Sequence, residues 1–120
     1  MELSSGAGLS GLVLGSTDPK RLGAWYQAAF APEADLADSV LWLEQGVLVF
    51  EERDDVAERS AEPGRVIINI QVSDLAALVT HLNGLGDVTW IRPVEEIQIG
   101  LIATVKDVDG NFVNVWQPKG

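Results

Sequence analysis

The residues best suited to contact a small molecule lie near the end of the chain, in the segment KDVDGNFVNVW that spans positions 106–116. Asp109-Gly110 is typical of a tight turn, since glycine tolerates positive φ and aspartate caps its own turn backbone. In the alternating strand that follows, Val113 and Val115 suit a core. The opposite face consists of Phe112, Asn114 and Trp116. Aromatic rings beside an amide are the usual lining of a small-molecule cleft, so this segment predicts a ligand-binding face.

Period-two alternation assigns one face of each predicted strand to the same cleft. The members of that face are Val13, Val49, Glu51, Ile67, Asn69, Gln71, Phe112, Asn114 and Trp116. Trp42 and Trp90 are further wall candidates whose facing the pattern does not fix. In a cleft, the rings stack on a planar ligand while the amides and Glu51 orient it. In the alternative interpretation, the rings belong to the core or a subunit interface and the amides face water.

Hydrophobic periodicity and capping signals predict the elements that position these residues. The first half contains a strand over 9–15, a helix from its N-cap Asp18 to Phe30, and strands over 34–36, 40–45 and 47–52. The second half contains a strand over 66–72, a helix that follows Asp74 and is stopped by Gly84 and Gly86, and strands over 88–92, 101–107 and 112–117. Residues 94–99 form either a loop or a ragged edge strand, because Pro93 disfavours a central one.

The order of a strand, a helix and three strands therefore occurs twice, which indicates an internal duplication. We expect one domain over 1–120, with a first module over about 9–53, an acidic linker over 54–64 and a second module over about 65–118. Residues 1–8 are expected to be a loose leader. Each half alone buries its sheet on one side only, so pairing of the halves or of two chains is expected to cover the other side.

Composition restricts the class of protein. Hydrophobic residues make up 47% of the chain and charged residues 22%, as in a soluble globular protein. The net charge of −10 disfavours nucleic-acid binding, since it repels phosphates. It attracts cationic ligands or simply keeps the protein soluble. No apolar run is long enough to span a membrane, and the absence of cysteine is compatible with the cytoplasm.

Three segments in this order resemble the vicinal oxygen chelate superfamily, which contains glyoxalases, bleomycin resistance proteins and extradiol dioxygenases. They are LVLGSTD leading to Trp25-Tyr26, then the stretch from Ile68 that ends in VSDL at 72–75, and DVDGN at 107–111 followed by Asn114-Val115. The resemblance covers nearly the whole chain. It implies an α+β fold of two βαβββ modules that form a cupped mixed sheet with helices on the outer face, commonly in a homodimer.

In metal-dependent members of that superfamily, four inward strand positions supply His, Glu, His and Glu. The resemblance places those positions at Gly11, near Val49, at Ile67 and at Asn114. None of the four is a good ligand for a divalent transition metal. The only histidine, His81, lies on the second predicted helix. We therefore expect no metal and no cofactor.

These observations lead to a hypothesis of a metal-free protein that binds a small organic molecule, planar or cationic, in the cup, as a sequestering or resistance protein does. The alternative is a small lyase, isomerase or dioxygenase-type enzyme in which Glu51 transfers a proton or an atypical metal site operates. A third interpretation is a partner-binding module whose cup is filled by its own side chains. The residues alone favour a protein without catalytic activity but leave all three open.

Overall fold

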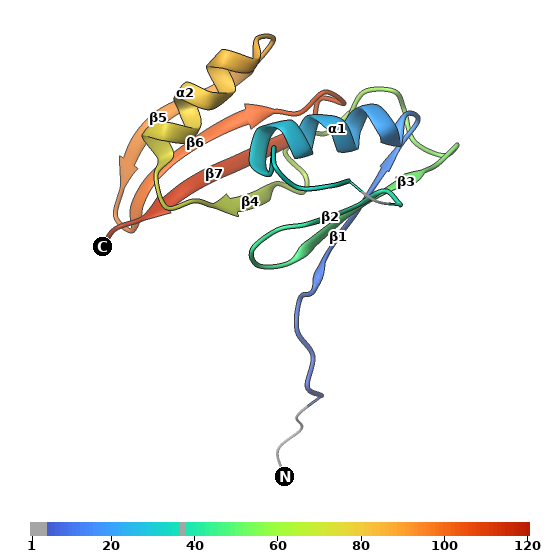
Figure 1. The fold of residues 1–120 in the computed structure, drawn as a ribbon, viewed down its shortest axis with the longest axis horizontal. Helices are drawn as coiled ribbons and strands as arrows, with labels where there is room; N and C mark the ends of the chain where they lie inside the picture. Colours follow the sequence, from blue (N-terminus) through green and yellow to red (C-terminus); the bar gives the residue numbers. More distant parts are fainter. Residues whose placement is uncertain (1–4, 37) are drawn as a thin grey trace.

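A computed structural model describes residues 5–36 and 38–120, which form seven strands and two helices. The first half contains β1 (Gly11–Ser16), α1 (Pro19–Phe30), β2 (Val40–Trp42) and β3 (Val47–Glu52). The second half contains β4 (Ile68–Gln71), α2 (Leu75–Leu85), β5 (Thr89–Ile97), β6 (Gly100–Lys106) and β7 (Phe112–Pro118). The predicted leader falls partly outside the described residues; residues 5–10 are exposed and have neither helix nor strand (Figure 1).

The strands form two mixed sheets, one of three strands in the order β1-β3-β2 and one of four in the order β4-β7-β6-β5. In each sheet the first strand of that half pairs in parallel with the last one, and the remaining pairs are antiparallel. The shared order agrees with the duplicated pattern in the sequence. The α+β class is thereby confirmed, although the two halves form separate sheets where one continuous cupped sheet was expected.

The strand predicted over 34–36 was wrong. The Ala34 N–H donates to the Ala31 carbonyl, and the Ala34 carbonyl accepts from Gln27 Nε2, so a turn after α1 uses the backbone groups that a sheet would need. Leu36 then packs against Gly23, where an added Cβ would lie 2.9 Å from the leucine side chain. The first half therefore lacks one of its three expected strands after α1.

Residues 94–97 belong to β5, which is an edge strand, as one of the two alternatives predicted. The pairing of β5 with β6 shifts register between Trp90 and Arg92 and again between Arg92 and Glu95. Pro93 lies within the second of these shifts. Because proline cannot donate to a ladder, an irregular edge is where a strand tolerates it.

Both helices begin where their capping residues predict. The Asp18 side chain accepts a hydrogen bond from the Arg21 N–H, and the Asp74 side chain accepts one from the Ala77 N–H. The end predicted at Phe30 is confirmed. In α2 the predicted stop at Gly84 was wrong, because the helix continues to Leu85 and ends at Gly86, whose φ of 76° favours glycine. No helix in the described part of the chain is long and apolar enough to cross a membrane.

The helix α1 joins the two sheets through one hydrophobic core. Leu22 and Tyr26 of α1 pack with Leu48 and Phe50 of the first sheet and with Val105 and Val113 of the second. The side of the second sheet that bears Ala103 and Val115 packs on Leu75 of α2. Each sheet thus buries the face toward its helix and leaves the opposite face available (Figure 1).

Two buried carboxylates in the β6–β7 turn tie the halves together. Tyr26 Oη donates to Asp107 Oδ2 over 2.6 Å, and Ser16 Oγ donates to Asp109 Oδ2 over 2.6 Å. Asp107 Oδ1 also accepts from the N–H groups of Asp109 and Asn111, which fixes the turn. We call the two side-chain contacts, Tyr26 with Asp107 and Ser16 with Asp109, the carboxylate clasp. Burial raises the pKa of the Tyr26 hydroxyl, and the Asp107 carboxylate raises it further, so this hydroxyl remains a donor.

The clasp predicts a pH dependence of stability. Burial raises the pKa of the Asp109 carboxyl above its ordinary value of 3.8, against the opposing effect of the Ser16 hydrogen bond. The native state therefore binds this proton more tightly than the unfolded state does, so the ionised Asp109 carboxylate destabilises the native state at neutral pH. This destabilisation disappears as the pH falls through the folded pKa toward 3.8.

We expect Asp109→Asn, which still accepts from Ser16, to be stabilised relative to the wild type at neutral pH, and this advantage to shrink in acid. Urea unfolding of both proteins at a series of pH values measures the difference. A difference that grows as the pH falls would contradict the assignment.

Candidate functional site

The open face of the second sheet carries a chain of polar side chains. Asn69 of β4 lies opposite Asn114 of β7, which lies opposite Thr104 of β6. Thr104 Oγ1 donates to Asn114 Oδ1 over 2.6 Å, and Asn114 Nδ2 donates to Asn69 Oδ1 over 2.9 Å. The register places the aromatic residues on the same face: Trp116 lies opposite Gln71, and Phe112 lies opposite Lys106.

The open face of the first sheet is apolar. Val13 of β1 lies opposite Val49 of β3, which lies opposite Val40 of β2. Trp42 belongs to the same face because it lies opposite Val47. Val13 is 61% exposed and Trp42 is 73% exposed. Such exposure over neighbouring apolar side chains is uncommon on the surface of a monomeric protein.

Glu51 lies on that same face at the end of β3. Its Oε2 atom accepts from Arg53 Nη1 over 2.8 Å, and the same guanidinium binds Asp55 over 2.7 Å. The Arg53 guanidinium lowers the pKa of the Asp55 carboxyl. Glu51 is therefore already engaged in an ion pair that is half-exposed to solvent.

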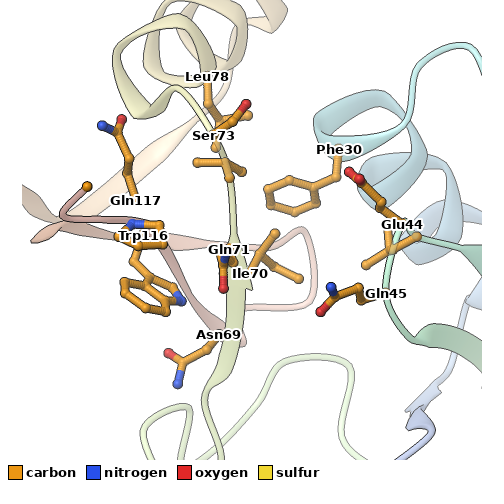
Figure 2. A pocket seen from close by; sticks show the side chains of 14 residues that line it. Phe30, Glu44, Gln45, Asn69, Ile70, Gln71, Ser73, Leu78, Trp116 and Gln117 are labelled. Carbon is orange, nitrogen blue, oxygen red and sulfur yellow. The ribbon is translucent and has the colours of Figure 1, made fainter. Parts of the chain in front are cut away.

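A cavity of about 840 Å³ lies along the edge of β4 that does not pair with β7. It is bounded by the end of α1, the β2–β3 turn, β4, the start of α2 and the end of the chain. The lining residues are Phe30, Leu43, Glu44, Gln45, Asn69, Ile70, Gln71, Val72, Ser73, Leu78, Trp116, Gln117, Pro118 and Gly120. Figure 2 shows Trp116 and Asn69 on one side of β4 and Ile70 and Phe30 on the other.

Three residues predicted for the cleft, Asn69, Gln71 and Trp116, line this cavity. Asn114 joins them through its hydrogen bond to Asn69, and Phe112 lies further along the same face. Ile67 precedes β4 and is exposed. Val13, Trp42, Val49 and Glu51 share the face of the other sheet and do not line this cavity.

Trp90 does not join either open face. It lies opposite Val105, whose side chain is buried in the core, and its Nε1–H donates to Asn83 Oδ1 of α2 over 2.8 Å. Its ring therefore lies on the helix side of the second sheet. The expectation that it forms a wall of the cleft does not agree with this position.

Sequence reasoning missed Thr104 and Lys106 on the open face and Phe30, Glu44 and Gln45 around the cavity. The first two follow the same alternation as Ile102 along β6, so a period-two pattern extended to that strand finds them. The other three come from a helix end and a turn, whose approach to β4 only the tertiary structure reveals.

The four positions at which the resemblance noted from the sequence places metal ligands do not fit a metal ion here. Gly11 and the aliphatic side chains of Val49 and Ile67 offer no donor atom. The remaining candidate oxygen, Asn114 Oδ1, already accepts from Thr104. Among residues 5–36 and 38–120, no three His, Cys, Asp or Glu side chains are arranged to hold a metal ion.

Several solved structures have the same architecture. A glyoxylase/bleomycin resistance protein/dioxygenase domain from Frankia sp. EAN1pec is 16% identical with a TM-score of 0.72, over 94% of this chain and 98% of that one. TioX from Micromonospora sp. ML1 is 16% identical with a TM-score of 0.70, over 94% and 100%. A glyoxalase-related enzyme from Fulvimarina pelagi is 19% identical with a TM-score of 0.67, over 92% and 87%.

The chain therefore has the glyoxalase/bleomycin resistance/dioxygenase fold, as its resemblance to the vicinal oxygen chelate superfamily predicted. At these identities the similarity defines the fold alone. No family model and no curated protein matches the sequence.

Proposed function

We propose that this protein binds a small organic molecule with a planar ring and sequesters it without metal chemistry. The observation that carries the proposal is that the half-buried ring of Trp116 lies on the same face as the hydrogen-bonded amides of Asn69 and Asn114, beside a cavity of about 840 Å³. Rings supply stacking area and amides supply orientation, which is the usual division of labour in a small-molecule site. Solved structures that share the fold include proteins whose names refer to bleomycin resistance.

A thermal-shift screen of planar aromatic compounds tests this function. Binding to the native state alone stabilises it by RT ln(1 + L/Kd), where L is the free ligand concentration, so the melting temperature rises with the logarithm of that concentration once it exceeds Kd. We expect stabilisation by a subset of the planar compounds and its loss in Trp116→Ala. Complete absence of stabilisation across the set, at millimolar concentration, would remove the support for a binding function.

The enzymatic alternative requires a free proton acceptor on the open faces or a bound metal ion. Glu51, the sequence-based candidate, is paired with Arg53, and this contact gives no support to proton transfer. Elemental analysis of protein purified without chelators tests the metal version. A stoichiometric metal ion would overturn the argument from the four donor positions.

We further propose that the binding form is a homodimer. The apolar face of the first sheet, which includes Val13 and Trp42, is too exposed for an isolated globule, and a second copy is the partner that would cover it. We expect Val13→Lys to shift the mass measured by light scattering toward the monomer, since it buries a charge in that interface. The matched control is Leu85→Lys at the end of α2. A monomeric wild type at every concentration would contradict the dimer.

A further inference from the structure

We propose that the ligand carries a carboxylate on its planar ring, and that Asn69 and Lys106 on the open face of the second sheet bind this carboxylate. The inference rests on the proposed binding function and specifies the chemical class of the ligand. The inference is drawn from the direction of the hydrogen bonds on that face and from the charge of the residues there.

The hydrogen-bond chain has a defined direction. The 2.6 Å contact between Thr104 Oγ1 and Asn114 Oδ1 has the length of an O–H···O bond, so the hydroxyl donates. The 2.9 Å contact from Asn114 Nδ2 to Asn69 Oδ1 has the length of an N–H···O bond. The Asn69 side-chain oxygen therefore already accepts the hydrogen bond from Asn114, and the Asn69 NH₂ group points outward. A ligand on this face therefore meets a hydrogen-bond donor, the Asn69 NH₂ group, which favours a ligand that offers an oxygen acceptor.

The charge of this face is opposite to that of the whole chain. Lys106 lies two residues beyond Thr104 on β6, so its side chain leaves the sheet on the same side. Arg92 lies opposite Thr104 and forms an ion pair with Glu95 over 2.6 Å. No carboxylate in the described part of the chain forms an ion pair with Lys106. One positive charge is therefore left over on a face of a protein whose net charge is −10.

The two aromatic side chains lie where they can stack on a planar ring that carries a carboxylate. Phe112 lies opposite Lys106, and Trp116 follows Asn114 by two residues on the same face of β7. Positions two apart along a strand are roughly 7 Å apart. This separation allows a ring stacked on Trp116 to direct a carboxylate toward Asn69. Glu51, the carboxylate on the open face of the other sheet, is already bound to Arg53. Glu44 also lines the cavity, but it comes from the β2–β3 turn and not from the open face that carries the rings, where the unpaired charge among the described residues is that of Lys106.

Three probes that share one ring test this inference: 2-naphthoate, 2-naphthylmethylammonium and 2-naphthalenemethanol. We expect titration calorimetry at low salt to give at least roughly tenfold tighter binding of 2-naphthoate than of the ammonium compound. The carboxylate accepts hydrogen bonds from Asn69 and Lys106, whereas the ammonium group has no acceptor and is repelled by Lys106. Tighter or equal binding of the ammonium compound would overturn the inference and leave the binding function intact. If none of the three probes binds, both the function and the inference fail.

Two variants assign the contact to its residues. Asn69→Asp keeps the oxygen that accepts from Asn114 but replaces the outward donor by a negative charge, and Lys106→Gln removes the positive charge. We expect each variant to weaken 2-naphthoate binding by roughly tenfold or more and to leave 2-naphthalenemethanol binding nearly unchanged. The controls Gln98→Glu and Lys20→Gln make the same change in charge at exposed positions away from the face. Variants that bind 2-naphthoate as tightly as these controls would overturn the assignment.

Discussion

Asp107→Ala is expected to destabilise the native state by about 3–5 kcal/mol, because it leaves a buried tyrosine hydroxyl and two backbone N–H groups without their acceptor. Asp107 accepts from Tyr26 Oη over 2.6 Å, from the Asp109 N–H over 2.8 Å and from the Asn111 N–H over 2.9 Å. Urea unfolding at a fixed protein concentration measures the loss, since the proposed dimer would make apparent stability depend on concentration.

The matched control for that variant is Asp54→Ala, which removes an exposed carboxylate from the segment between the two halves. We expect this control to change stability by less than about 0.5 kcal/mol. A second variant, Tyr26→Phe, removes only the hydroxyl and is expected to give an intermediate loss. If Asp107→Ala were as stable as Asp54→Ala, the clasp would have no role in holding the fold.

Phe50→Ala is the second change with a large expected effect, a destabilisation of about 3–5 kcal/mol from lost burial and the cavity that remains. Phe50 is 2% exposed, and its ring centroid lies 5.6 Å from that of Tyr26. The ring also fills the space above Gly23, where an added Cβ would lie 3.1 Å from it. The loss therefore affects the contact between α1 and the first sheet, which urea unfolding reports.

Phe50→Leu keeps most of the volume and is expected to cost less than about 1.5 kcal/mol. Val66→Ala removes a smaller apolar group from an exposed position and serves as the control, with an expected change within about 0.5 kcal/mol. An equal effect of Phe50→Ala and Val66→Ala would show that the core described here does not stabilise the first half.

The sequence predicts the helices best because their ends depend on local chemistry. Asp18-Pro19 and Asp74 cap α1 and α2 with contacts three residues away, and neither needs a tertiary partner. The strand over 47–52 is equally clear and was predicted with its observed bounds. Strand lengths elsewhere depend on partners: the strand predicted over 66–72 pairs only over Ile68–Gln71.

Other parts depend on tertiary contacts that no pattern contains. The facing of Trp90 follows from its pairing with Val105, and the register shift after Trp90 places Arg92 on the opposite face, which a regular alternation does not reveal. The cavity along β4 exists because the β2–β3 turn and Phe30 approach that edge from the other half of the chain. The pairing of Asn69 with Asn114 agrees with the alternation in two strands, but the direction of their hydrogen bond follows only from the geometry.

The carboxylate clasp has a consequence for how the two halves of the chain behave. Each contact joins a donor from the first half, Tyr26 or Ser16, to an acceptor from the second, Asp107 or Asp109. A cut between residues 54 and 64 would give two fragments, in which the apolar partners of α1 are exposed and these polar groups have lost their hydrogen-bond partners. We therefore expect the whole chain to melt in one cooperative transition, with neither fragment folding alone, so that each half is the obligate complement of the other.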